Sequence, residues 1–426
     1  MAGTVKPEPY WWDAAPRRTE VPATLPARVD VAVVGGGYTG LSAALTLARR
    51  SREVLVFDAD AAGSGASSRN QGHLGVNRHF YARATAAYGK EKALQLFRED
   101  EAALEFTFDL IQREKIECYL QRNGRFVGAA KQGQYEQMAR EAEALRREIG
   151  YDVHTVPRAE VRQHIGTDDY VGGEYRPREG CVHSALFHNG LLDRALGAGA
   201  KVVSGTPVQH IERTKDGFTV TSPKGKVQAR DVLIATNALS GDLIPYIKRR
   251  ILPLNGAGIA TEPLPPELIR SVVPGMRPCV DTRKVGRTVR PSPDGTRIVY
   301  GGRATMAESD PLVSGVKLRA IMCSVFPQLS DVRITHSWFG PTGITFQMMP
   351  HIGMYQGMHC ALGYSPYGVA QAPYLGHKAA LRILRANDAA TAFDDLPFET
   401  RPLYYGNPWF LPAVVAYYRY KDFISR

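Results

Sequence analysis

A glycine-rich turn near the start of the chain constrains the fold more than any other stretch. The run Val31–Val34 is typical of a short buried strand, and it ends in Gly-Gly-Gly-Tyr-Thr-Gly at residues 35–40. The small residues of 41–48 are typical of a closely packed helix, and a second apolar run, Val54–Phe57, ends at Asp58. This order predicts a β-α-β unit that binds a dinucleotide.

The glycines of this turn have separate roles. Gly35 makes the turn, Gly37 lets the backbone approach a pyrophosphate, and Gly40 lets the helix pack against the strand. The helix N-terminus offers free N–H groups and the positive end of its dipole to the phosphates. We therefore expect Tyr38 and Thr39, which begin the helix, to contact the cofactor as well.

Asp58 follows the glycines at about the twenty-residue distance expected of an acid that accepts hydrogen bonds from ribose hydroxyls. An acid there, instead of an arginine, argues against a 2′-phosphate and hence against NADP. The alternative is a glycine-rich turn with an ordinary aspartate at a strand end. The motif by itself does not distinguish NAD from FAD.

Composition sets the broad class. The chain has 426 residues, 44% hydrophobic and 22% charged, which is ordinary for a globular protein with a substantial core. Its five cysteines have no paired metal-ligand spacing, so we expect no metal site, no disulfide framework and a cytoplasmic location. We also expect no stable membrane insertion, because no apolar run reaches membrane-spanning length.

The formal net charge of +11 is compatible with nucleic acid, an anionic membrane or an anionic small molecule as a partner. The positive residues are spread along the chain and form only short clusters. We therefore expect no nucleic-acid partner, and we take the charge as a hint that the substrate is anionic.

Later segments repeat the nucleotide-binding pattern. Val232–Ala238 is typical of a buried strand, and Gly363–Val369 leads into a second helix with a glycine at its start. A loop rich in glycine and serine, Gly63–His73, follows the first β-α-β unit. Between these parts, residues 81–150 have helical spacing, and residues 249–335 have strand-like runs separated by turns.

Matching stretches along nearly the whole chain carry a resemblance to a known family. They are Gly35–Ala44, Gly65–Gly72, Ala235–Ala238, Ala260–Leu264, Gly301–Ala304, Trp338–Gly340, Pro350–Gly353, Gly363–Ser365, Ala372–Gly376 and Pro408–Pro412. In these stretches the chain resembles the D-amino-acid oxidase (DAO) family of FAD-dependent oxidoreductases, and within it the gamma-glutamylputrescine oxidase branch.

The resemblance implies an α/β fold, α+β overall. It has a Rossmann-like FAD-binding domain of the glutathione-reductase type and an interleaved substrate domain built on an antiparallel sheet. The expected segments are 1–83, 182–247 and 337–390 for the FAD-binding domain, 84–181 and 248–336 for the substrate-binding domain, and 391–426 for a C-terminal tail that packs on the body. The oligomeric state stays open.

The resemblance also assigns cofactor contacts. Residues of the loop after the second strand would line the flavin and its phosphates: Ser67, Ser68, Arg69, Asn70, Gln71 and Gly72. Val208 would lie at the adenine end. Gly363, Gly368 and Val369 would belong to the segment that brings a helix N-terminus to the pyrimidine side of the flavin ring. The alternatives are that Ser68 and Asn70 are loop caps and that Val208 is ordinary core.

Two departures from relatives matter. Some relatives attach the flavin to a cysteine, but the comparable stretch here, Gly340–Gly343, has none, so we expect non-covalent FAD. Where many relatives carry an acid two residues after a threonine, this chain has Gln347 after Thr345, and a role transferred from that acid is in doubt.

The implied activity is oxidation of a C–N bond of a small primary or secondary amine to an imine, with O2 reduced to H2O2. Two alternatives remain: a flavin amine dehydrogenase that passes electrons to a quinone or carrier, and a flavin-dependent RNA-modifying or RNA-binding protein.

The catalytic candidates are His73 and Tyr364, and the candidates for substrate binding are Tyr300, Arg303, Trp338 and Tyr367. For the histidine and the aromatics, the alternative is a structural role. Arg303 or Arg290 suits an anionic group of the substrate, and both are alternatively surface or cofactor-supporting residues.

Overall fold

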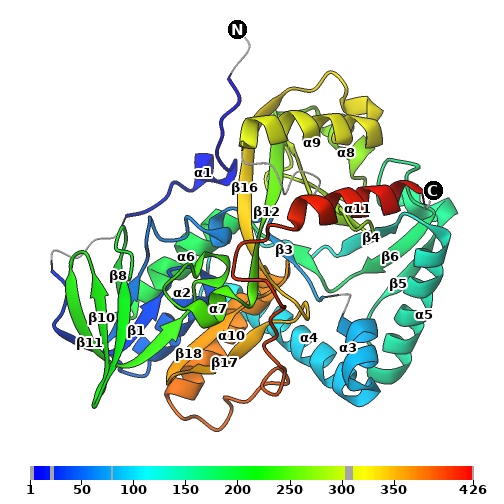
Figure 1. The fold of residues 1–426 in the computed structure, drawn as a ribbon. Coiled ribbons are helices and arrows are strands. Elements are labelled where there is room, and N and C mark those ends of the chain that lie inside the picture. Colours follow the sequence, from blue (N-terminus) through cyan, green and yellow to red (C-terminus); the bar gives the residue numbers. More distant parts are fainter. Residues whose placement is uncertain (1–3, 20–23, 78–79, 303–309, 425–426) are drawn as a thin grey trace.

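The computed structural model describes residues 4–19, 24–77, 80–302 and 310–424. Within these residues the chain forms two large sheets, one at the lower left of Figure 1 and one at its upper right. A two-stranded ladder of β3 (His73–Leu74) and β7 (Gly180–Cys181) completes the strands.

The first sheet has the order β17-β18-β11-β1-β2-β8, with the hairpin strand β10 on β11 and β9 on β10. Strand β1 pairs in parallel with both β11 and β2, as the predicted β-α-β unit requires. Its side chains alternate between two cores, because Val31 and Val33 point to one face and Ala32 and Val34 to the other. The strands are β1 (Arg28–Val34), β2 (Val54–Phe57), β8 (Lys201–Val203), β9 (His210–Thr214), β10 (Gly217–Ser222), β11 (Gly225–Ile234), β17 (His351–Tyr355) and β18 (Met358–Leu362).

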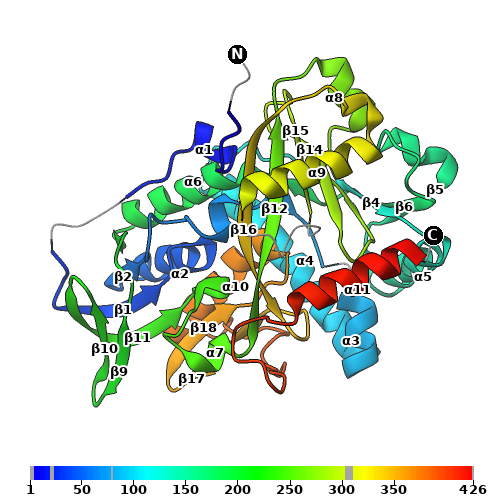
Figure 2. The same ribbon diagram turned by 45° about the horizontal axis from the view of Figure 1, so that its top comes forward.

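The second sheet has the order β16-β12-β15-β14-β13-β4-β6-β5, and its pairs are antiparallel except for β13 with β4. The two long strands β12 and β16 pair over most of their length, and in Figure 2 they extend upward from the region of the first sheet. The strands are β4 (Arg125–Ala129), β5 (His154–Pro157), β6 (Gly172–Arg176), β12 (Ile251–Thr261), β13 (Cys279–Asp281), β14 (Arg287–Pro291), β15 (Ile298–Gly302) and β16 (Ile334–Thr345).

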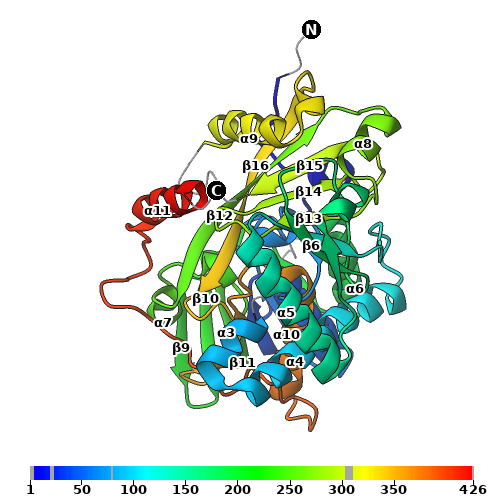
Figure 3. The ribbon, with the colours of Figure 1, turned by 90° about the vertical axis from the view of Figure 1, so that its right-hand side faces the viewer.

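Helices cover both sheets. Residues of α2, α4, α6 and α10 share one core with one face of the first sheet, and residues of α8 and α9 pack on the second sheet. Figure 3 shows α3, α4 and α5 together on one side of the molecule. The helices are α1 (Trp11–Ala14), α2 (Tyr38–Ala48), α3 (Phe80–Tyr88), α4 (Lys90–Arg113), α5 (Gln132–Ile149), α6 (Ser184–Gly197), α7 (Pro245–Lys248), α8 (Pro266–Val272), α9 (Pro311–Val325), α10 (Gly368–Ile383) and α11 (Leu411–Ile424).

Helices α2 and α10 touch with almost no side chain between them. A Cβ on Gly376 would lie 2.2 Å from the carbonyl oxygen of Thr39, so only glycine fits there. The hydroxyl of Ser42 donates to the carbonyl oxygen of Pro373 at 2.6 Å, which ties the same two helices together. The first turns of α2 therefore pack directly on α10, although the two helices are more than 300 residues apart in sequence.

The predicted fold class is confirmed, because the sheets combine a parallel nucleotide-binding core with an antiparallel sheet. The domain limits stay a prediction. The predicted boundary at residue 336 falls inside β16, which belongs to the second sheet up to Thr345. Among the described helices, none is long and apolar enough to cross a membrane.

Helix α6 starts on a histidine that must be neutral. The ring of His183 is buried, and its Nδ1 accepts a hydrogen bond from the backbone N–H of Leu186 at 3.2 Å as the N-cap of the helix. Burial lowers the pKa of His183 to about 4, with help from the positive charge of Arg290. The unfolded chain, in which a histidine has a pKa of about 6.5, therefore takes up a proton that the folded protein does not.

We expect His183→Asn to reduce the pH dependence of stability. Below pH ~6.5 the unfolded state binds more protons, so the native protein loses stability as the pH falls from ~6.5 towards ~4. Asparagine keeps an acceptor at the N-cap but does not titrate, and the slope of unfolding free energy against pH should fall by up to ~1.4 kcal/mol per unit. Urea unfolding at several pH values measures this slope. His183→Ala should flatten it equally while being less stable than His183→Asn at every pH, because alanine offers no cap, and an unchanged slope in both variants would contradict the neutral buried ring.

Candidate cofactor cavity and active site

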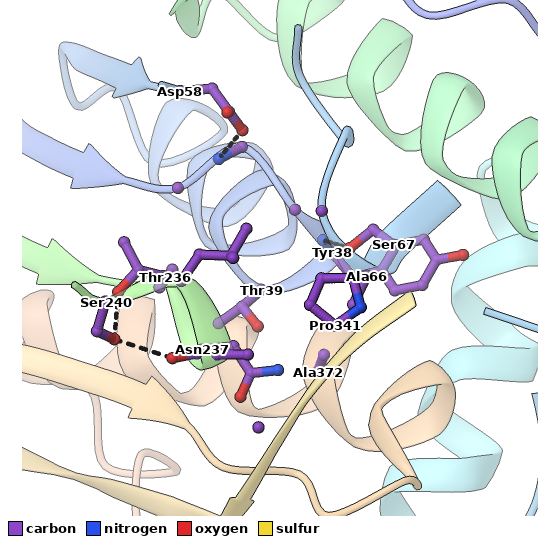
Figure 4. A pocket seen from close by; sticks show the side chains of 18 of the residues that line it. Tyr38, Thr39, Asp58, Ala66, Ser67, Thr236, Asn237, Ser240, Pro341 and Ala372 are labelled. Carbon is purple, nitrogen blue, oxygen red and sulfur yellow. Dashed lines mark hydrogen bonds between the residues drawn. The ribbon is translucent and has the colours of Figure 1, made fainter. Parts of the chain in front are cut away.

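One cavity of about 390 Å³ opens at the carboxyl end of β1. Its walls come from parts far apart in sequence that meet in Figure 4: the glycine turn, the loop after β2, the segments after β8 and β11, the end of β16 and the start of α10. The lining residues that match the predicted cofactor contacts are Gly35, Gly37, Tyr38, Thr39, Asp58, Ser67, Asn70, Val208, Gly368 and Val369.

The glycine turn has the geometry predicted for it. Gly35 has φ +111°, and a Cβ there would lie 2.7 Å from the carbonyl oxygen of Ala235. A Cβ on Gly40 would lie 2.0 Å from the carbonyl oxygen of Gly35, although Gly40 itself does not line the cavity. Gly37 faces Ser67, whose hydroxyl would be 2.8 Å from a Cβ. The turn can therefore pack against its neighbours in this way only because it has no side chains.

Asp58 braces this turn in addition to lining the cavity. Its carboxylate accepts hydrogen bonds from the backbone N–H of Gly36 at 2.9 Å and of Asp60 at 3.1 Å. Burial raises the pKa of Asp58, and these N–H donors partly offset the rise because they favour the charged form. The carboxylate is thus held at the edge of the cavity, where we expect the ribose (Figure 4).

The loop after β2 is held mainly by its own hydrogen bonds. Ser67 accepts from the N–H of Tyr38 at 3.0 Å, at the start of α2. The Asn70 side chain donates to the carbonyl oxygens of Ala66 and Ser67 and accepts from the N–H of Gly72, so it is a loop cap that also lines the cavity. Ser68 is buried behind the lining, where its hydroxyl donates to the carbonyl oxygen of Gly63.

Arg69, Gln71 and Gly72 do not line the cavity. The Arg69 guanidinium stacks on Trp12 at 4.5 Å and donates to the carbonyl oxygen of Ser64. The side-chain oxygen of Gln71 accepts from the hydroxyl of Thr288 in the second sheet. These residues connect the loop to the rest of the protein.

The start of α10 closes the other end of the cavity. Gly368, Val369 and Ala372 line it, and the N-cap residue Tyr367 makes no side-chain cap hydrogen bond. The positive end of α10 therefore faces the cavity with backbone N–H groups that no side chain caps. Gly363 has φ +79° and lies just outside the lining.

Asn237 is a lining residue for which the sequence predicts no individual role. Its side-chain oxygen accepts from the N–H of Gly363 at 2.9 Å, and it lies 2.3 Å from where a Cβ on Gly343 would be. It therefore holds two late segments at the cavity (Figure 4). The position of the stretch Ala235–Ala238 could have indicated a ligand contact, because it follows a buried parallel strand and α/β proteins bind ligands at the carboxyl ends of such strands.

Of the two catalytic candidates, only Tyr364 lines the cavity. Its hydroxyl shares a hydrogen bond of 2.6 Å with that of Thr39, and burial raises its pKa above the ordinary value. His73 lies on β3, partly buried and away from the lining. Burial lowers its pKa well below the ordinary value, as do the charges of Arg290 and Arg125.

The substrate-binding candidates are not gathered at the cavity. Trp338 is buried, and its indole N–H donates to the carbonyl oxygen of Arg69 at 2.8 Å. Tyr300 is buried in the core under α8 and α9. Tyr367 is partly buried at the start of α10, with Arg125 5.9 Å from its ring. Arg303 lies outside the described residues.

The residues present fit FAD in three respects. The glycines at 35–37 present backbone without side chains to the cavity, a carboxylate stands at the expected ribose position, and two helix N-termini face the same cavity. None of the five cysteines lines the cavity, in keeping with non-covalent binding: Cys118, Cys181, Cys279, Cys323 and Cys360.

We expect Asp58→Asn to weaken FAD binding about tenfold, which corresponds to ~1.4 kcal/mol. The amide has one acceptor oxygen where the carboxylate has two, so either the turn or the ribose loses a charge-assisted hydrogen bond. Fluorescence titration of the flavin-free protein measures the dissociation constant. The matched control is Asp60→Asn, whose side chain is 68% exposed. Equal effects of the two substitutions would contradict a specific role of Asp58.

Comparisons with known proteins agree with this site. Residues 30–382 match the family of FAD dependent oxidoreductases called DAO. The chain is 32% identical to probable oxidoreductase OrdL of Rhizobium meliloti, over 87% of each protein. It is 31% identical to gamma-glutamylputrescine oxidoreductase of Escherichia coli, over 86% of each.

Solved structures show the same fold. Glycine oxidase from Geobacillus kaustophilus superposes with a TM-score of 0.72 at 24% identity, covering 88% of this chain and 99% of that one. L-amino acid deaminase from Proteus vulgaris superposes with a TM-score of 0.73 at 16% identity, covering 89% of this chain and 96% of the other. The glycine cradle, the carboxylate beside it and the match over residues 30–382 together show that this chain belongs to the DAO family and is an FAD-dependent oxidoreductase.

Proposed function

We propose that the enzyme oxidises a carbon–nitrogen bond of a small primary or secondary amine to an imine, with O2 as the final electron acceptor and H2O2 as a product. The substrate class is a polyamine derivative, an amino acid or an amine with a carboxylate or phosphonate. Relatives named gamma-glutamylputrescine oxidoreductase and glycine oxidase support this class. The net charge of +11 supports an anionic group on the substrate.

The observation that carries the proposal is that two helix N-termini face one cavity. Helix α2 presents its first turn at Tyr38 and Thr39, and α10 presents its first turn at Gly368 and Val369. One positive end suits the diphosphate of the cofactor, and the other suits negative charge that develops at the opposite end of the cavity. This arrangement favours a reaction in which electrons move from a neutral substrate into the cofactor.

Bound in this cavity, FAD would supply the acceptor for the two electrons of the C–H bond next to the amine nitrogen, which O2 would finally receive. The protein then has to hold the amine in its neutral form, keep its C–H bond directed at the cofactor and exclude water. Tyr367 remains our best candidate for contact with the substrate, because it is partly buried and stands at the N-cap of α10. Trp338 and Tyr300 are packed inside the protein, which suits a supporting role behind the site.

We expect the purified protein to be yellow and to lose its flavin absorbance when mixed under nitrogen with an amine substrate. The panel includes polyamines, amino acids, N-methylated amines and aminophosphonates, with tert-butylamine as the control because it lacks a C–H bond next to nitrogen. On admission of air, the absorbance should return with one H2O2 per two electrons.

Three outcomes would contradict the proposal. A folded but colourless protein that takes up no flavin would contradict the FAD binding on which the proposal rests. A yellow protein that no amine or amino acid bleaches would refute the substrate class. Bleaching followed by slow reoxidation in air would refute O2 as acceptor and favour a dehydrogenase that uses a quinone or carrier.

We expect Tyr364→Phe to lower kcat/KM less than tenfold and to leave the pH profile unchanged between pH 6 and 9. Its hydroxyl is bonded to Thr39 and its pKa is raised above the ordinary value, so it stays neutral in this range. Removal of a general acid or base would instead cost about 10²–10⁴-fold. Steady-state kinetics over this pH range distinguishes positioning from proton transfer.

Thr39→Val is the matched control, because it removes the same hydrogen bond from the other side. If the hydroxyls act only by holding α2 and α10 together, the double variant should be no worse than the worse single variant. Additive losses of more than tenfold each would contradict the positioning role and support Tyr364 as a catalytic residue.

A further inference from the structure

Most of the exposed large apolar and aromatic side chains lie in only two segments. Of eleven such residues in the described part of the chain, eight belong to α9 or to residues 403–420. We call these eight the apolar face: Leu312, Val313, Val316, Leu403, Tyr405, Trp409, Tyr417 and Tyr420. A soluble monomer rarely leaves so many of its exposed apolar residues in one region, so this face requires a partner.

Helix α11 presents an apolar stripe to solvent. Val415 is buried against the protein, whereas Ala413, Ala416, Tyr417 and Tyr420 are exposed. These four residues are spaced by three, four and seven positions and therefore share one side of the helix. A helix that packs on a globular body normally has polar residues on that side. The tyrosines are 52% and 60% exposed.

Helix α9 has the same arrangement. Leu318 and Met322 are buried under it, while Leu312, Val313 and Val316 point outward, and Val316 is 73% exposed. Figure 3 shows α9 and α11 on the same side of the molecule, and both lie at the front in Figure 1. The two helices that carry the exposed stripes therefore lie on one side of the molecule.

Basic residues stand among and beside these side chains. Lys317 is exposed on α9 directly after Val316. The guanidinium of Arg249 lies 4.7 Å from the ring of Tyr405, and exposed Arg401 lies 5.1 Å from the ring of Phe346. Acids are present as well: Asp310 caps the N-terminus of α9, and Glu399 forms an ion pair with Arg401 at 2.7 Å. The whole chain has a net charge of +11.

We propose that the apolar face docks the enzyme on the surface of an anionic lipid bilayer. Tryptophan and tyrosine favour the boundary between lipid headgroups and acyl chains, and basic residues around them are attracted to anionic lipid. A second copy of this chain fits the face less well, because it would bring a second charge of +11 to the contact. Docking is shallow, since no described helix is long and apolar enough to span a bilayer.

The face is separate from the cofactor site. None of its eight residues lines the cavity, so substitutions there test docking without altering the flavin cradle. The tail that carries most of the face is fastened to the body by a hydrogen bond of 2.5 Å from the hydroxyl of Tyr404 to the carbonyl oxygen of Ile251, and by one of 2.6 Å from Gln347 to the carbonyl oxygen of Pro397.

The test is flotation of the yellow holoenzyme with vesicles of phosphatidylcholine alone and of equal parts phosphatidylcholine and phosphatidylglycerol. We expect most of the protein to float with the anionic vesicles, little with the neutral ones, and less at 0.5 M than at 0.1 M salt. The double variant Val316→Asp/Tyr420→Asp should bind at least tenfold more weakly. The control is Met354→Asp, an exposed apolar residue on β17 outside the face, which should bind like the native protein.

The flavin absorbance and melting temperature of each variant show that it is folded. If the double variant loses flavin, Trp409→Ser alone takes its place. Three results would overturn the proposal: no flotation of the native enzyme with anionic vesicles, equal flotation of the native enzyme and the double variant, or a dimer in light scattering that the double variant dissociates. The last result would assign the face to a second copy of the chain.

Discussion

Helix α2 can begin beside the end of β1 only because residue 40 has no side chain: a Cβ there would lie 2.0 Å from the carbonyl oxygen of Gly35. The rest of the cofactor site depends on this contact, because it brings the first N–H groups of the helix to the edge of the sheet. Asp58 then accepts a hydrogen bond from Gly36, and Ser67 accepts one from Tyr38, so the neighbouring elements are built onto the turn.

A second close contact extends this arrangement to the far end of the cavity. Gly376 of α10 approaches the carbonyl oxygen of Thr39, and the hydroxyls of Thr39 and Tyr364 share a hydrogen bond. The start of α2 is therefore held directly against α10 and against the segment that leads into it. The consequence is electrostatic: the positive ends of two helices lie at one cavity, so together they stabilise negative charge on a ligand better than either end would alone.

A buried cation links the second sheet to the flavin loop. Arg290 of β14 is fully buried and donates to the carbonyl oxygens of Gln71 and Val182. Its charge is stabilised by these carbonyl dipoles and by the Trp11 ring at 5.7 Å. Its charge also helps keep His73 neutral, which makes that histidine a poor general acid near neutral pH.

The sequence alone determined the local part of the site, because a β-α-β turn forms between neighbouring residues and needs glycine at fixed positions. It also placed Ser67, Asn70 and Asp58 at the cavity and predicted the mixed fold. Only the tertiary structure decided which aromatic and titratable side chains reach the cavity. Trp338 and His73 are turned into the protein, and Asn237 is brought to the cavity by contacts with residues more than 100 positions away. Orientation of this kind depends on which face of a strand meets its packing partner, and that is a property of the assembled sheets rather than of any one stretch.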